Sequence, residues 1–330
     1  NGFGERANRI SSLAPFGGSL YAGTFNFGGN GAQLWRMDSG LNWTAVMTNG
    51  FGNAANVGIG HLLEFNGELY AGTWNSINTP PYTQGGEIWR SSDGTNWTQV
   101  VSSGFGDPTN GEVMRLGVFN GQIYAGTWSY TNTHGAEIWR SNTGDIGSWS
   151  QVVSNGLGDA SNEAVLTMEE FNGALYAGTY SWGDVPNGAD IWRTTDGLNW
   201  TAVITNGFGY TGTYAVSSLE PFGGYLYAGI GRYDLATNSY PGGQIWRCSQ
   251  ASGCDEASDW QQVTGGFEKP ENYDVRALLG FEGHLYAVIA NSTTGLEVWR
   301  TADGTTWEQV GVAGLGDSNN SAPYWDNSAA

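Results

Sequence analysis

The residues whose types suit catalysis are carboxylates on the predicted inner strands. Hydrolysis of a glycosidic bond needs two carboxylates roughly 5–10 Å apart, one of them with a raised pKa. The sequence offers these candidates: Glu64, Glu169, Glu170 and Glu220. Nothing in their spacing sets two of them apart as a pair, and solvent-facing strand ends would explain them equally well.

Neither the histidines nor any nucleotide-binding motif predicts a catalytic or metal site. His61, His134 and His284 are scattered along the chain and predict neither a metal cluster nor a catalytic triad. There is no Gly-x-Ser-x-Gly elbow, phosphate-binding loop or dinucleotide fingerprint. We expect no cofactor and no metal. Calcium is the weaker alternative, because recurring linkers begin at Asp107, Asp159 and Asp317, where turn formation by the aspartate is the simpler explanation.

Composition excludes several classes of protein. The 330 residues include 12 basic and 31 acidic side chains, a net charge of −19, so a surface that tracks nucleic-acid phosphates is excluded. No apolar run is long enough to span a membrane. With 16 tryptophans and 53 glycines, the chain is too aromatic for a disordered protein and its glycines are too irregular for collagen.

Internal repetition organises the whole chain. A phrase of the type Phe-x-Gly-x-Leu-Tyr-Ala-Gly recurs with its tyrosine at Tyr21, Tyr70, Tyr124, Tyr176, Tyr227 and Tyr286. A Trp-Arg dipeptide follows each time, at Trp35, Trp89, Trp139, Trp192, Trp246 and Trp299. A further tryptophan opens the last segment of each copy, at Trp43, Trp97, Trp149, Trp200, Trp260 and Trp307. Twelve of the 16 tryptophans therefore belong to the repeat, where we expect them to pack between copies.

Each copy reads as four short strands joined by hairpin turns such as Asn66-Gly67 and Asp93-Gly94. Four-stranded repeats of 50–54 residues predict an all-β, six-bladed β-propeller with four antiparallel strands per blade. The expected blades cover roughly 1–52, 53–106, 107–158, 159–209, 210–270 and 271–316. An open β-solenoid is the alternative architecture.

The turn between the third and fourth strands resembles the Asp-box of BNR-like, sialidase-type propellers. Residues 91–97, 194–200 and 301–307 carry it, with Asp93, Asp196 and Asp303 each followed by glycine, and each is one residue shorter than the family pattern. The resemblance implies the fold and no particular activity. A sialidase would need three arginines around the carboxylate of its substrate. Six of the 12 basic residues, however, belong to the repeated Trp-Arg dipeptides. Arg115 and Arg276 are the inner-strand exceptions, and pairing with Glu112, Asp274 or Glu169 would account for them.

In the fifth copy a loop with Cys248 and Cys254 replaces the Asp-box turn. The spacing favours a local disulfide and an oxidising compartment, with two free thiols as the alternative. The chain begins with Asn1-Gly2-Phe3-Gly4, a phrase that recurs internally, which suggests a processed product.

Binding is expected on the variable loops between second and third strands, because variable loops on a rigid scaffold usually carry recognition. Aromatic rings beside small polar groups suit sugar rings or a protein surface. The candidate ligand-binding residues are Trp74, Asn75, Tyr82, Trp128, Tyr130, Tyr180, Trp182, Asp184, Tyr233 and Tyr240. Packing of these rings onto blade edges is the alternative for each.

Two further features suggest a surface protein. Residues 317–330, including Trp325, form a tail that could latch the ring or add a strand to a neighbouring subunit. Triplets that allow glycosylation begin at Asn42, Asn96, Asn199, Asn291 and Asn319.

The sequence thus leads us to expect a non-catalytic extracellular or cell-surface propeller, structural or binding, able to self-assemble or to bind a glycan or protein. A lectin that uses the aromatic loop face and a sialidase-like glycoside hydrolase are the two alternatives.

Overall fold

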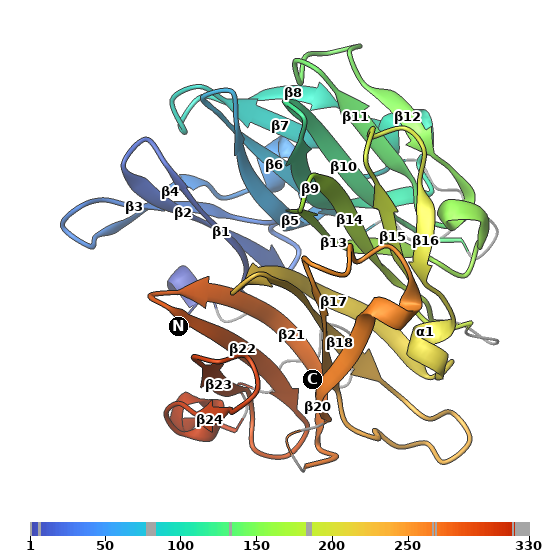
Figure 1. Ribbon diagram of the computed structural model, residues 1–330. Helices are drawn as coiled ribbons and strands as arrows, with labels where there is room; N and C mark the ends of the chain where they lie inside the picture. Colours follow the sequence, from blue (N-terminus) through green and yellow to red (C-terminus); the bar gives the residue numbers. More distant parts are fainter. Residues whose placement is uncertain are drawn as a thin grey trace. The chain divides into compact units, whose positions relative to one another are not determined.

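The computed structural model describes residues 2–5, 8–76, 84–131, 134–182, 187–265, 267, 269–318 and 320. It divides into two compact units, residues 1–165 and 166–330. Both are built from antiparallel β-strands (Figure 1). The described residues contain no helix long and apolar enough to cross a membrane.

Unit 1 consists of short strands connected in sequence order. They are β1 (Asn8–Phe16), β2 (Ser19–Asn26), β3 (Leu34–Met37), β4 (Trp43–Met47), β5 (Asn56–Phe65), β6 (Glu68–Asn75), β7 (Ile88–Ser91), β8 (Thr98–Val101), β9 (Asn110–Phe119), β10 (Gln122–Ser129), β11 (Ile138–Ser141) and β12 (Ser150–Val153). Strand β13 (Ala164–Phe171) begins in unit 1 and continues into unit 2.

Unit 2 continues the same pattern. Its strands are β14 (Ala174–Tyr180), β15 (Ile191–Thr194), β16 (Thr201–Ile204), β17 (Thr213–Phe222), β18 (Tyr225–Arg232), β19 (Gln244–Ser249), β20 (Trp260–Gly265), β21 (Asn272–Phe281), β22 (His284–Asn291), β23 (Glu297–Thr301) and β24 (Glu308–Gln309). Short helical turns connect successive groups of four strands: η2 (Gly50–Gly52), η3 (Ser103–Gly106), η4 (Asn155–Gly158) and α1 (Asn206–Gly209). Three more lie elsewhere: η1 (Gly2–Gly4) precedes β1, η5 (Ala257–Asp259) joins β19 to β20, and η7 (Ala313–Gly316) follows β24.

Strands β5 to β8 illustrate how the repeat folds. β5 pairs with β6, β6 with β7 and β7 with β8, all antiparallel, so the four lie side by side in sequence order (Figure 1). The first hairpin turns at Asn66-Gly67, whose φ angles of 51° and 77° suit a tight two-residue turn. The four-stranded meander predicted for this copy is therefore present. Single residue pairs join neighbouring groups, such as Trp74 of β6 opposite Glu112 of β9.

The repeated tyrosine fastens one repeat to the turn of the next. Tyr70 is fully buried, and its hydroxyl donates to the Thr143 carbonyl at 3.3 Å. Arg90, of the Trp-Arg dipeptide, pairs with Asp145 of the same turn at 2.7 Å. In an earlier repeat, Trp97 packs against the cluster that contains Tyr21, which agrees with the expectation that repeat tryptophans pack between copies.

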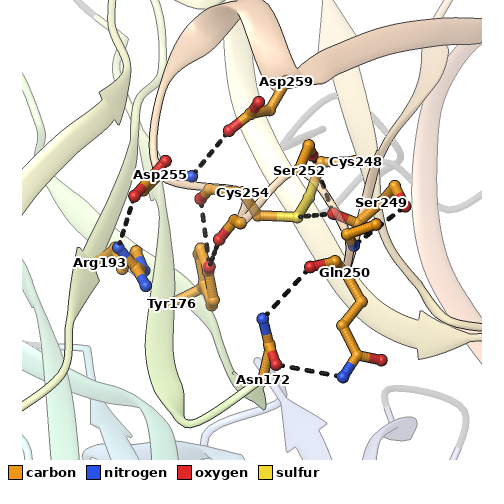
Figure 2. The surroundings of a disulfide bond; sticks show 12 residues. Asn172, Tyr176, Arg193, Cys248, Ser249, Gln250, Ser252, Cys254, Asp255 and Asp259 are labelled. Atoms are coloured by element: carbon orange, nitrogen blue, oxygen red, sulfur yellow. Dashed lines mark hydrogen bonds and ion pairs between the residues drawn. A yellow bond between two sulfur atoms is a disulfide. The ribbon is translucent and has the colours of Figure 1, made fainter.

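The cysteine loop makes the same contact in unit 2 (Figure 2). Cys248 and Cys254 form a disulfide, which confirms the sequence prediction. Tyr176 donates to the Cys254 carbonyl at 3.1 Å, and Arg193 lies 3.6 Å from Asp255. The disulfide loop therefore contacts the repeated tyrosine and arginine as the turn at Thr143–Asp145 does in unit 1.

The linkers between repeats are left-handed turns, which the sequence did not predict. In η3 the φ angles of Ser103, Gly104 and Phe105 are 49°, 59° and 65°. Left-handed backbone costs roughly 1–2 kcal/mol for each residue with a Cβ. Stacking offsets part of this cost, because Phe105 lies 4.6 Å from Trp139 and 5.7 Å from Trp149, ring centre to ring centre.

A pair of glycine substitutions should separate backbone conformation from contact between repeats. Gly67 and Gly94 have similar φ angles of 77° and 71°, but an added Cβ would meet nothing at Gly67 and would overlap the Tyr21 hydroxyl at Gly94. We expect Gly67→Ala to cost about 1 kcal/mol and Gly94→Ala to cost about 1–3 kcal/mol more through overpacking. Urea unfolding measures both, and equal losses would show that the Tyr21 contact contributes nothing.

Candidate functional site

A glutamate lies between two tryptophans on one face of unit 1. Glu112 of β9 is directly opposite Trp74 of β6 on one side and Trp128 of β10 on the other. Directly opposed residues project from the same face of a sheet. Strands two positions apart are separated by roughly 10 Å, yet the two indole rings are stacked with centres 6.2 Å apart. The rings therefore lean toward each other over β9, and Glu112 Oε1 lies close to Gly60 of β5, where an added Cβ would approach it to 2.7 Å.

The Glu112 carboxyl is buried and lacks a hydrogen-bond partner among the described residues. Its exposed fraction is 0%, and neither oxygen has a hydrogen-bond partner among the described residues. Burial disfavours the charged form of the group and raises the pKa of Glu112 to about 8. At neutral pH this side chain is a protonated acid that can give up a proton.

Tyr130 closes the aromatic cluster from the end of β10. Its hydroxyl accepts a hydrogen bond from Trp74 Nε1 at 2.6 Å and donates to the Asn75 carbonyl. Burial, and then the neighbouring Glu112 carboxyl, raise the pKa of Tyr130 above its usual range. Phe27 is 53% exposed and packs edge-to-face with Trp74, with ring centres 5.2 Å apart. It extends the aromatic cluster to the surface.

His61 and Arg115 lie on the inner strands of the same unit. The His61 ring accepts from the Leu116 amide at 3.3 Å. Burial and the Arg115 charge hold the pKa of His61 well below its usual range, so the ring is neutral near pH 7.

A second glutamate with a raised pKa lies at another repeat position. Burial raises the pKa of Glu163 to about 7. Glu163 immediately precedes β13, whose first residue, Ala164, is the one opposite Trp128. Glu163 therefore does not occupy the repeat position of Glu112.

Unit 2 contains its own aromatic group at the ends of three strands. Trp182 lies 5.4 Å from Tyr214 and 5.3 Å from Tyr233, and Tyr233 lies 5.1 Å from Tyr240. Trp182 and Tyr240 are 40% and 38% exposed, whereas Tyr180 is buried. Trp182 and Tyr240 therefore present part of their rings at the surface.

A buried ion pair supports this part of unit 2. Asp274, fully buried, lies 3.1 Å from Arg276 and accepts hydrogen bonds from Tyr214 at 2.9 Å and Ser217 at 2.7 Å. Arg276 therefore has the aspartate partner that the sequence suggested.

The structure separates the predicted ligand-binding residues into two groups. It brings together Trp74, Asn75, Trp128 and Tyr130 in unit 1, and Tyr180, Trp182, Tyr233 and Tyr240 in unit 2. Asn75 and Tyr180 are buried and can only support the surface. Tyr82, Asp184, Asn319 and Trp325, with nearly all of the tail, lie outside the described residues.

One glycosylation candidate needs correction. The Asn291 side chain is 1% exposed and donates to Asn272 at 2.7 Å, so it is inaccessible to a modifying enzyme in the folded chain. Asn42, Asn96 and Asn199 are exposed on turns, where Asn96 and Asn199 each donate to the turn aspartate at 2.7 Å.

The linker aspartates form turns. Asp107 Oδ1 accepts from the Thr109 amide at 2.9 Å, and Asp159 does the same for Ser161 at 2.9 Å. Across the described part of the chain, no group of three or more histidine, cysteine or acidic residues could hold a metal.

Sequence reasoning named Glu112 only as a partner for arginine. A signal was available, because the same repeat position is occupied by Gly58, Ala164 and Ala215 in other copies. The fifth-copy junction places a second acid, Asp274, at this position, so the position holds either a small residue or a charged one. The exposed Glu64 and Glu170, by contrast, were candidates only because they are carboxylates on inner strands.

Comparison with known proteins gives a fold. No family model matches the chain, and no curated protein matches it. Solved structures do match. A GH74 xyloglucanase from Xanthomonas campestris is 17% identical with a TM-score of 0.59, and the match covers 92% of this chain and 45% of that one. The chain thus spans less than half of that enzyme's length.

Two further structures are matched over most of their length. The WD40 β-propeller domain of Doa1 is 14% identical with a TM-score of 0.54, covering 92% of this chain and 82% of that one. An α-L-arabinofuranosidase, arb93a, from Fusarium graminearum is 16% identical with a TM-score of 0.52, covering 86% and 88%. The chain is therefore an all-β protein with a propeller-like fold.

These matches contradict the expectation of a protein without catalysis. Two of the three structures are glycoside hydrolases. A propeller-like fold is therefore no argument for a protein without catalysis. The scarcity of arginines argued against a carboxylate-clamping sialidase and does not extend to hydrolases of neutral sugars. The expectation of a non-catalytic, structural role is therefore contradicted.

Proposed function

We propose that the protein is a glycoside hydrolase in which Glu112 is the proton donor. The observation that carries the proposal is a fully buried carboxyl with no hydrogen-bond partner among the described residues, placed between Trp74 and Trp128. A carboxyl kept protonated by burial is suited to protonate the leaving oxygen of a glycosidic bond.

The two indoles provide the binding half of the site. Tryptophan faces stack well on the apolar faces of sugar rings. In this proposal Trp74 and Trp128 part to admit a sugar residue, and the hydroxyl of Tyr130 holds Trp74 through its indole nitrogen. Hydrolysis also requires a second carboxylate, so an experiment on the site must include a second buried acid.

The architecture that accompanies this function is a six-bladed propeller with four strands per blade and the blade limits given by the repeat. The Asp-box resemblance supports it, because Asp93 Oδ1 accepts from the amides of Thr95 and Asn96 at 2.8 and 2.7 Å, as a turn-forming aspartate should. We also propose an extracellular location, which the Cys248–Cys254 disulfide supports.

Hydrolysis of neutral polysaccharides and of aryl glycosides tests the function. We expect the full chain to release reducing ends from at least one neutral polymer, with activity that falls above about pH 8 as Glu112 ionises. Glu112→Gln should lower kcat by about 10²–10⁴-fold. Glu64→Gln, which changes an exposed carboxyl on β5, is the matched control and should retain activity.

Glu163→Gln, which removes the other acid of unit 1 with a raised pKa, completes the panel and tests whether Glu163 is the second carboxylate. Absence of turnover across the panel, or full activity in Glu112→Gln, would refute the proposal.

A further inference from the structure

A small pocket in unit 2 contains a hydroxyl group that lacks a partner. The pocket is lined by Ser181, Trp182, Thr211, Tyr214, Tyr233 and neighbouring residues, and encloses about 10 Å³. Ser181 is 0% exposed, and its Oγ has no hydrogen-bond partner among the described residues. A buried hydroxyl without a partner costs free energy unless something polar occupies the space beside it.

The size of the pocket limits what can enter. A volume of about 10 Å³ is the space of one water-sized group. A single hydroxyl group fits this space. None of the residues lining the pocket is charged, so no group there would compensate an anionic ligand.

The rim of the pocket offers an aromatic surface. Trp182 is 40% exposed and Leu235 is 56% exposed, and both line the pocket. Tyr214 holds the Trp182 ring edge-on at 5.4 Å, and its own hydroxyl is fixed by Asp274. An exposed indole beside a buried hydroxyl donor combines stacking with one directional hydrogen bond, which is what a neutral sugar ring requires.

We propose that unit 2 carries a subsite for one neutral sugar residue, which stacks on Trp182 and places a hydroxyl against Ser181 Oγ. This inference rests on the proposed carbohydrate substrate and does not depend on the role of Glu112. It assigns Trp182 and Ser181 as determinants of carbohydrate affinity.

The repeat supplies a matched control for the serine. Ser129 occupies the same repeat position, since its amide donates to the Glu163 carbonyl at 2.8 Å just as the Ser181 amide donates to the Tyr214 carbonyl at 2.8 Å. The Ser129 hydroxyl already donates to the Thr131 carbonyl at 3.2 Å. Removing it should therefore leave sugar binding unchanged.

Calorimetric titration of the full chain tests the subsite. The Glu112→Gln variant is used as the background so that the probes are not consumed. The probes are cellohexaose, xylohexaose and linear arabinohexaose, with hexagalacturonate as the acidic comparison. We expect at least one neutral probe to bind and the acidic probe to bind more weakly.

In that background Ser181→Ala should weaken binding about tenfold, the value of one hydrogen bond, and Trp182→Ala by at least as much, whereas Ser129→Ala should have no effect. Thermal melts check folding, and Ser181→Ala should melt no lower than its background because it removes a hydroxyl without a partner.

The outcomes separate the two proposals. Binding that depends on Trp182 and Ser181 in a chain without hydrolytic activity would support the subsite and refute the proposed function. Hydrolysis with binding that ignores both substitutions would refute the subsite alone, and a pocket that holds only a water molecule predicts this result. Absence of both binding and hydrolysis would refute both proposals.

Discussion

Replacing Glu112 by glutamine should stabilise the protein at pH 8 and flatten the pH dependence of its stability. Folding transfers the carboxyl from water, with a pKa of 4.5, to a site where the pKa is about 8. Between these values the folded chain holds a proton that the unfolded chain has released. Stability is therefore highest below the lower pKa and falls as pH rises toward 8, by about 1.4 kcal/mol per pH unit.

Glutamine does not titrate, so the variant should lose this slope. We expect it to gain on the order of 4 kcal/mol relative to the parent at pH 8 and to differ much less near pH 5. Urea unfolding at pH 5, 6.5 and 8 measures the difference. Glu163, whose pKa burial raises to about 7, remains in both proteins, so its contribution cancels.

Glu64→Gln, an exposed site, should give a curve parallel to that of the parent. A Glu112→Gln curve that is also parallel would mean that the carboxyl is not buried as described. A gain in stability together with a loss of hydrolysis would identify a residue kept at the expense of stability for its chemistry.

Replacing Asp274 by asparagine should have the opposite effect on stability. Asp274 occupies the repeat position that Glu112 occupies in its own copy, opposite the end of the second strand of its repeat, but its carboxylate is compensated by Arg276, Tyr214 and Ser217. Loss of its charge leaves the guanidinium of Arg276, whose side chain is only 19% exposed, without this counter-ion. Breaking a buried ion pair from one side costs about 3–5 kcal/mol.

Two smaller substitutions measure how much of this loss of stability comes from the hydrogen bonds to Asp274. Ser217→Ala and Tyr214→Phe each remove one hydrogen bond to Asp274 and should cost about 1 kcal/mol each. Chemical unfolding of the three variants at pH 7 provides the comparison. An Asp274→Asn loss no larger than that of Ser217→Ala would show that the ion pair adds nothing to the hydrogen bonds.

Local sequence features predicted much of the architecture. The repeat phrases, the Asn66-Gly67 hairpin and the strand alternation predicted the meander of β5 to β8, because turn chemistry and side-chain periodicity act over only a few residues. The five-residue gap between Cys248 and Cys254 was likewise enough to predict their disulfide. The left-handed Phe105 was not predictable, since its conformation depends on stacking against Trp139 and Trp149.

The candidate site shows the limit of that reasoning. The sequence by itself determined the repeats, the strands and the positions of the aromatic loops, because these depend on local patterns. Only the tertiary structure decided that Glu112 is buried opposite Trp74 and Trp128, that Asp274 is neutralised by Arg276, and that the Ser181 hydroxyl has no partner among the described residues. The sequence shows where a carboxyl or hydroxyl group stands in the chain. Its protonation and reactivity depend on how far residues distant in the sequence exclude water from it.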